Sequence, residues 1–308
     1  MKNSTDNVDR PLAGIAMMLV GIAGFAVMDA TIKWLTAEYP VPQVIALRSW
    51  FGLPILILLA MREGGLPALR TGRPLVHVGR YLLVLLLSLS FFWALSRMKL
   101  VDTVAIAFAA PIIITALSVP LLREPVGLRR WIAIGVGFCG VLIMLRPGMG
   151  VFQWAALAAL GSAVVYALLM ITTRAFKNTE STASLMLYPQ IGISLTGLLM
   201  VNYFWVTPPL LDLALFALAG FFGSIGVLCL THAFRMAPAA TIAPFEYSAL
   251  LWATLLGYFI WGELPDSITV LGGSIVGASG LYIIYRETRK TGRTIPKLPS
   301  ISPDDTGQ

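Results

Sequence analysis

The chain has 308 residues, of which 57% are hydrophobic and 12% are charged, and its mean hydropathy is +0.82. Soluble chains carry about 25% charged residues, so this composition excludes a soluble protein and predicts an integral membrane protein. The net charge of +7 does not indicate nucleic-acid binding, because the basic residues follow the membrane topology described below.

Ten apolar segments are long enough, at roughly 20 residues each, to cross a bilayer as helices. Short breaks rich in proline and glycine separate most of them, which forces neighbouring helices to be antiparallel. We therefore predict an all-α integral membrane protein with ten transmembrane helices. They are expected at about 12–36, 42–61, 78–97, 102–122, 129–146, 152–174, 183–205, 210–235, 239–261 and 267–286.

Lys and Arg residues are distributed unequally between the two sides of these helices. Of the 22 basic residues, 17 lie in the two tails and in the loops that follow even-numbered helices, and four lie in the opposite loops. Loops with the basic excess face the cytoplasm. The sequence thus predicts a bacterial inner-membrane protein with a cytoplasmic tail at 1–11 and a basic cytoplasmic tail at 287–308.

The sequence also repeats with a period near 140 residues. Arg97 recurs as Arg235 at an offset of 138, and Glu124 recurs as Glu263 at an offset of 139. We expect two five-helix repeats, at 12–147 and 152–286. Because five is an odd number, the second repeat must be inverted in the membrane, an arrangement that places substrate sites near the midplane. Glycines recur at an offset of 140 as well: Gly137 and Gly140 match Gly277 and Gly280.

The most unusual segment runs from Thr241 to Glu263, because this apolar run contains a carboxylate, Glu246. A charge in the centre of a membrane helix costs at least ~2.5–3.5 kcal/mol. Pro244 removes a backbone donor nearby, and Pro111 does so in the corresponding segment of the first repeat. We predict that the helix of 241–263 bends around an internal polar site, and that Glu246 faces this site. A carboxylate bonded to backbone freed by Pro244 is the structural alternative.

Three charged residues fall within the first two spans. Asp29 and Lys33 are four residues apart, so they share one helix face, and Arg48 enters the second span from the same side. One hypothesis is a substrate-binding rim with an excess of positive charge. The alternative is a structural Asp29–Lys33 ion pair, with Arg48 extending to the membrane interface.

Aromatic and basic residues within the other spans are further candidates. Trp93, Tyr166 and Tyr247 could stack on a planar substrate, although single aromatics in membrane helices more often belong to the core or the interface. His232 and Arg235 end the eighth span on the side of Glu246. With Glu246 they predict an inner gate or a proton-coupling site.

These features resemble one family of transporters. The ten spans, the two repeats, the A-P-F-E-Y run at 243–247 and the Gly262-Glu263 pair are similar to the EamA family of the drug/metabolite transporter superfamily, over 12–286. Residues 28–30, 33–34, 39–40 and 48–49 resemble a bacterial subgroup of riboflavin importers and S-adenosylmethionine transporters.

The resemblance implies a secondary transporter that moves a small organic metabolite by alternating access across the lipid bilayer. Its specific prediction is uptake of riboflavin or a flavin-like compound. S-adenosylmethionine transport and export of amino acids or other metabolites are the alternatives.

The sequence predicts no enzyme, no cofactor and no metal site. It lacks the H-E-x-x-H, G-x-S-x-G and Walker lysine motifs, and two histidines are too few for the usual zinc site. The G-x-G-x-x-G match at 135–140 lies inside an apolar span without a preceding strand, so it does not predict dinucleotide binding. An intramembrane enzyme or receptor is a remote alternative. The glycines predict close packing within each half, with a homodimer as the lesser alternative.

Overall fold

The computed structural model describes residues 11–62, 65–122, 127–145, 154–176, 179–236 and 243–291. Within these ranges, helices fall on all ten predicted segments, and there is no strand. Six of the helical spans are long and apolar enough to cross a membrane by length and composition, and shorter apolar helices cover three further segments. The chain is an all-helical, multi-pass membrane protein.

The helices of the first part of the chain are α1 (Pro11–Leu35), α2 (Val41–Arg62), the 3₁₀ helix η1 (Leu66–Leu69), α3 (Pro74–Leu95), α4 (Leu100–Ala107), α5 (Ala110–Leu122) and α6 (Leu128–Leu145). Those of the second part are α7 (Trp154–Phe176), α8 (Thr182–Phe204), α9 (Leu210–Met236), the 3₁₀ helix η2 (Ala243–Tyr247), α11 (Ser248–Trp261) and α12 (Ser267–Thr291). Helix α12 thus extends beyond residue 286, where the predicted tail begins.

One predicted span is broken in the middle of the bundle, and the described part of another begins with a 3₁₀ helix. The fourth span divides into α4 and α5 just before Pro111, and in the ninth span η2, which contains Pro244, precedes α11. Proline cannot donate a backbone hydrogen bond and clashes with the preceding turn, so a break at these positions is expected. The fourth span is broken before Pro111, whereas the residues that precede η2 lie outside the described ranges, so the bend predicted at Pro244 stays a prediction.

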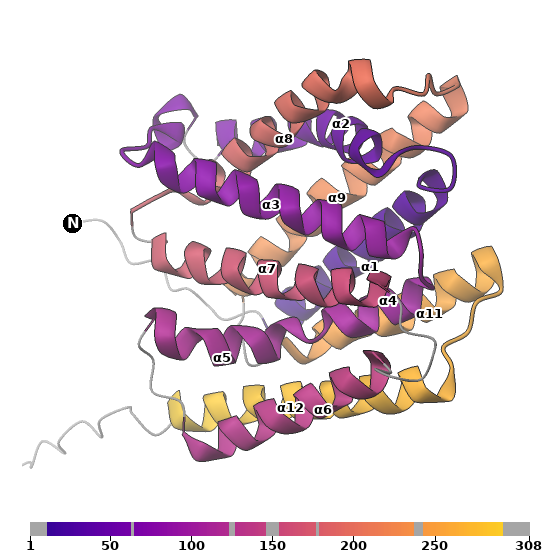
Figure 1. The fold of residues 1–308 in the computed structure, drawn as a ribbon. Helices are drawn as coiled ribbons and strands as arrows, with labels where there is room; N and C mark the ends of the chain where they lie inside the picture. Colours follow the sequence, from indigo (N-terminus) through magenta and orange to yellow (C-terminus); the bar gives the residue numbers. More distant parts are fainter. Residues whose placement is uncertain are drawn as a thin grey trace, which may run out of the picture.

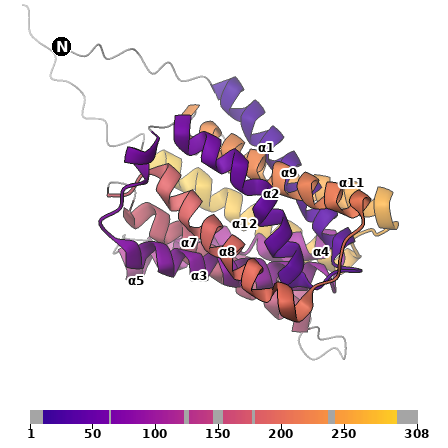
Figure 2. The same ribbon diagram turned by 90° about the horizontal axis from the view of Figure 1, so that it is seen from above.

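Eight helices close into a ring. Each helix contacts the next in the order α1, α9, α2, α8, α3, α7, α4 and α11, and α11 contacts α1. Helices α6 and α12 lie outside this ring and pack on each other; Figure 1 shows them along the lower edge, with α2 and α8 at the upper edge. Figure 2 shows the same bundle from above, and α1 also contacts α3 directly. The ring therefore defines a central region that both halves of the chain enclose.

Polar contacts fix the loops at both ends of the ring. At one end, the Tyr39 hydroxyl donates to the Asp212 carboxylate, which joins the α1–α2 turn to the start of α9. In the same region the Gln43 amide forms two hydrogen bonds with the backbone of Val206, at 2.6 and 2.9 Å. At the other end, a turn before α8 meets α3. There the imidazole Nε2 of His77 lies 3.1 Å from the Glu180 carboxylate, and both side chains are buried.

Glycines allow α6 and α12 to approach closely. A Cβ atom added to Gly140 would lie 2.8 Å from the carbonyl oxygen of Gly272, so backbone meets backbone here. This contact joins the two predicted repeats, which corrects the expectation that the glycines pack within each half. Gly277 and Gly280 face the ring of Tyr247 on η2 instead of α6.

We expect Gly140→Ala to destabilise the protein by about 1–3 kcal/mol, because the added methyl meets rigid backbone and forces α6 away from α12. The matched control is Gly135→Ala on the same helix, where nothing lies within 4 Å of the added atom. That control should be neutral or stabilising by up to about 1 kcal/mol, since alanine favours helix more than glycine does. Thermal unfolding in detergent measures both variants, and equal stability of the two would contradict the packing argument.

Candidate functional site

An ion pair joins α1 to the end of α11 at one end of the ring. The Lys33 ammonium lies 2.8 Å from both carboxylate oxygens of Glu263 and 2.7 Å from the carbonyl oxygen of Met98. The ammonium also lies 5.1 Å from the centre of the Trp261 ring. These contacts engage the three ammonium donors and connect α1, α11 and the α3–α4 connection. We call this set of contacts the Lys33–Glu263 clasp.

A helix cap places Glu263 in the clasp. Gly262 has a left-handed conformation, with φ 67° and ψ 16°, which glycine adopts without steric cost. Its N–H donates to the carbonyl of Tyr258, and the Glu263 N–H donates to the carbonyl of Gly257. The bond from Gly262 back to Tyr258 is the αL motif, which ends many helices. The chain changes direction at Gly262, which places the Glu263 carboxylate beside Lys33. The same carboxylate accepts a hydrogen bond of 3.2 Å from the backbone N–H of Leu100.

The ion pair between Asp29 and Lys33, considered as the structural alternative, is not formed. Lys33 pairs with Glu263 instead, because the clasp offers two carboxylate oxygens and a carbonyl. In this conformation the donors of Lys33 are engaged, so the residue is a contact between helices and not a free part of a binding rim. Sequence spacing along one helix could not show a partner 230 residues away.

Asp29 and Arg48 lie deeper in the ring, and their charges are not joined by an ion pair within the described residues. The two groups are close enough to interact electrostatically. One Asp29 carboxylate oxygen and the Arg48 Nε are buried without a hydrogen-bond partner. Among the described residues, the Arg48 guanidinium has polar or ring contacts with the Met28 sulfur, at 3.5 Å, and with the face of Phe92, where Cζ lies 5.4 Å from the ring centre. The structure brings Asp29 and Arg48 together as predicted, but leaves them incompletely satisfied.

A second polar cluster surrounds Glu246, the residue of η2 that comes two positions before α11. The carboxylate lies within electrostatic range of the hydroxyls of Tyr166 on α7 and Tyr247. A helix N-terminus carries a partial positive charge, which favours a carboxylate at this position. The structure thus brings together three predicted site residues of the second half of the chain, from α7 and η2.

Tyr247 also stacks on Phe108, which lies in the break between α4 and α5. The ring centres are 5.0 Å apart and the rings are inclined by 22°. The Tyr247 hydroxyl is buried without a hydrogen-bond partner, in space left by Gly280. Sequence reasoning missed Phe108 as a site residue. The available signal was its offset of 139 from Tyr247, which equals the offset between Glu124 and Glu263.

Three other predicted residues lie apart from these clusters. Trp93 is 38% exposed, and the Arg97 guanidinium covers its ring at 6.0 Å. The Nδ1 atom of His232 lies 2.9 Å from the carbonyl oxygen of Leu228, one turn earlier in α9. The side chain of Arg235 lies outside the described residues, so the gate predicted from these residues and Glu246 stays a prediction.

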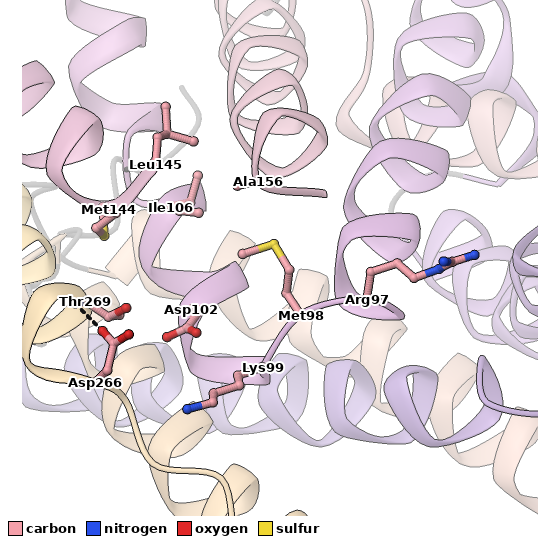
Figure 3. A pocket seen from close by; sticks show the side chains of 10 residues that line it. All are labelled: Arg97, Met98, Lys99, Asp102, Ile106, Met144, Leu145, Ala156, Asp266 and Thr269. Carbon is pink, nitrogen blue, oxygen red and sulfur yellow. Dashed lines mark hydrogen bonds between the residues drawn. The ribbon is translucent and has the colours of Figure 1, made fainter. Parts of the chain in front are cut away.

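A polar cavity of about 250 Å³ adjoins the clasp at Met98 and is shown in Figure 3. Asp266, the residue before α12, lines the cavity and accepts a hydrogen bond of 2.7 Å from the backbone N–H of Thr269. The predicted site residues do not line it. The lining residues are Arg97, Met98, Lys99, Asp102, Ile106, Met144, Leu145, Ala156, Asp266 and Thr269.

The chain belongs to the EamA-like transporter family. The family model matches twice, over residues 12–146 and 153–286. The resemblance inferred from the sequence is therefore confirmed, and the protein is a membrane transporter of the drug/metabolite transporter superfamily. One solved crystal structure matches with a TM-score of 0.62 at 19% identity, covering 89% of this chain and 98% of the other, and so shares the fold.

Characterised relatives carry names with different substrates. The chain is 31% identical to an S-adenosylmethionine uptake transporter of Rickettsia prowazekii, over 90% of this chain and 94% of the relative. It is 28% identical to a riboflavin transporter of Rhizobium johnstonii, over 89% of this chain and 91% of the relative. It is 26% identical to a pseudopaline exporter of Pseudomonas aeruginosa, over 86% of this chain and 93% of the relative.

We expect Lys33→Gln to lower the free energy of unfolding by about 1–3 kcal/mol, because it leaves a half-buried Glu263 carboxylate with the Leu100 N–H as its remaining partner. Lys99→Gln is the matched control, since the exposed Lys99 ammonium bonds only the Leu264 carbonyl in the described structure. Thermal unfolding in detergent compares the two variants. A loss in Lys33→Gln no larger than that in Lys99→Gln would exclude the clasp as a stabilising contact.

Proposed function

We propose that the chain is a ten-span secondary transporter of the bacterial inner membrane that works by alternating access between two inverted five-helix halves, 12–147 and 152–286. The contact pattern supports this proposal. In the proposed repeat, each span of the first half corresponds to the span five places later, so α1, α2 and α3 correspond to α7, α8 and α9. Under this correspondence the α1–α9 contact is equivalent to the α3–α7 contact, and the α2–α9 contact to the α3–α8 contact. The pairs α2–α8, α6–α12 and α4–α11 map onto themselves. Two halves related in this way can rock about a central site.

The observation that carries the proposal is the set of polar groups held inside the ring by both halves. Asp29 and Arg48 come from the first half, whereas Tyr166, Glu246 and Tyr247 come from the second. Charged groups at membrane depth are costly, and they are typical of substrate or ion pathways. Asp29 lies one turn from the clasp, about 6 Å along α1, whereas Glu246 is separated from the clasp by α11, which is about 21 Å long. The two clusters therefore lie at different depths of one pathway.

The excess of Lys and Arg on the side of both termini assigns that side to the cytoplasm. The clasp then lies at the periplasmic end, beyond Asp29 and Arg48. An ion pair that joins α1, α11 and the α3–α4 connection would close the pathway there and would have to break for substrate to enter. The conformation described is closed at the periplasmic end on this assignment.

A reporter fusion tests the orientation. A fluorescent protein that matures only in the cytoplasm, fused after Lys297, should be fluorescent, and alkaline phosphatase at the same position should be inactive, because the basic C-terminal tail is retained in the cytoplasm. Fusions after Glu38, in the predicted periplasmic turn, provide the matched control and should behave in the opposite way. Phosphatase activity at Lys297 would contradict the topology.

The substrate class that fits best is a metabolite with a planar ring, flavin-like or adenosyl-like, taken up into the cell. The name of the Rickettsia relative supports uptake of an adenosyl compound, and the name of the Rhizobium relative supports transport of a flavin. The Phe108–Tyr247 stack beside Glu246 offers aromatic surface and hydrogen-bonding groups to a planar ring. Export is the second candidate direction, which the name of the Pseudomonas relative supports.

Uptake into proteoliposomes tests the role of Glu246. Labelled S-adenosylmethionine and riboflavin are the substrates, and we expect accumulation of at least one of them. Glu246→Gln should lower the rate at least about tenfold, because the amide keeps the shape but loses the charge that attracts donors or protons. Glu38→Gln, in the α1–α2 turn, is the control and should transport normally. Normal transport by folded Glu246→Gln across pH would remove Glu246 from the mechanism.

A further inference from the structure

Arg48 has hydrogen-bonding capacity that the protein does not use. A guanidinium carries five N–H donors and keeps its charge under all physiological conditions. Here its contacts are a thioether sulfur, which is a weak acceptor, and an aromatic face. No described carboxylate forms an ion pair with it. A buried guanidinium in this state is suited to receive a carboxylate from a ligand, since arginine binds carboxylates through two parallel hydrogen bonds.

Asp29 supplies the opposite charge next to it. Its carboxylate interacts electrostatically with Arg48 without forming an ion pair, and one of its oxygens is buried without a donor. Lys33, one turn away on α1, cannot supply that donor in this conformation because Glu263 and Met98 engage its ammonium. Asp29 is therefore suited to receive an ammonium group.

The backbone of α9 lies close to the guanidinium. Gly223 on α9 faces Arg48, and a Cβ atom added there would lie 3.1 Å from Nη1 and would clash with the Met28 sulfur. The wall of the ring at this point is thus bare backbone. One apolar cluster includes Met28 and Phe92 and has Phe108 packed against it, so it extends from Arg48 to the Phe108–Tyr247 stack.

We propose that Asp29 and Arg48 bind the amino-acid head of a zwitterionic substrate, with Arg48 holding its carboxylate and Asp29 its ammonium. This proposal rests on the proposed transport function and narrows it. A substrate that carries an α-amino acid together with a planar ring, such as an adenosyl amino acid, fits both the head site and the aromatic stack. A flavin has no such head and would leave both charges unpaired in the pathway.

Binding to the intact protein in detergent tests the head site without any variant. The probes are S-adenosylmethionine, S-adenosylhomocysteine, 5′-methylthioadenosine and riboflavin, and the readout is thermal stabilisation. The first two carry the amino-acid head, whereas 5′-methylthioadenosine keeps the adenosine and lacks it. We expect the compounds with the head to bind about 10- to 100-fold more tightly than 5′-methylthioadenosine, because a ligand without the head cannot form charge-assisted hydrogen bonds with Arg48 and Asp29.

Arg48→Gln and Asp29→Asn should each remove this preference for the head while retaining the weaker binding of 5′-methylthioadenosine. Arg97→Gln is the control, since Arg97 contacts Trp93 away from Asp29 and Arg48, and it should bind as the wild type does.

Equal binding of 5′-methylthioadenosine and S-adenosylmethionine to the wild type would overturn the head site. Binding and uptake of riboflavin alone would also overturn it, while leaving the transport function intact. If none of the four compounds bound or were transported by folded protein, both the head site and the proposed transport of such metabolites would fall.

Discussion

The constraint on which this structure depends is the cost of charge inside an apolar membrane bundle. Each ionisable group there must find a partner within the protein. Lys33 meets this demand with a carboxylate and a carbonyl supplied by distant parts of the chain, and the left-handed Gly262 brings that carboxylate into place. The resulting clasp joins three segments at one end of the ring. The contacts that pair the charge of Lys33 are thus the same contacts that hold these three segments together.

Three buried polar groups inside the bundle lack a full set of hydrogen-bond partners. Arg48 retains unused donors, Asp29 an unused acceptor, and Tyr247 a buried hydroxyl without a partner. A protein that required these residues only for stability would gain by pairing them, because an unsatisfied buried polar group is destabilising. Their incomplete satisfaction is understandable if substrate completes it during part of the transport cycle. The contrast between the engaged Lys33 and the unengaged Arg48 is the basis on which we propose a closing contact for the first and substrate binding for the second.

The inverted arrangement that we propose would explain why the two ends of the molecule differ in chemistry. Phe108 and Tyr247 occupy corresponding positions of the two halves and stack on each other, as expected for residues near the axis that relates those halves. Glu246 lies next to Tyr247 and has no acidic counterpart, because Ala107 precedes Phe108. A symmetric scaffold thus carries an asymmetric site. The same scaffold can therefore carry the different substrates named for its relatives.

The sequence by itself determined the helical segments, the positions of Pro111 and Pro244 within them, the family and the presence of costly charges such as Asp29, Arg48 and Glu246. These features follow from local chemistry, since apolar length, proline geometry and charge in an apolar run can be read along the chain. Only the tertiary structure decided which charges are paired. Lys33 was expected near Asp29, but its carboxylate partner is Glu263, and Phe108 became a site residue only through its stack on Tyr247. Such partners depend on how helices distant in sequence pack, and spacing along one helix does not encode that packing.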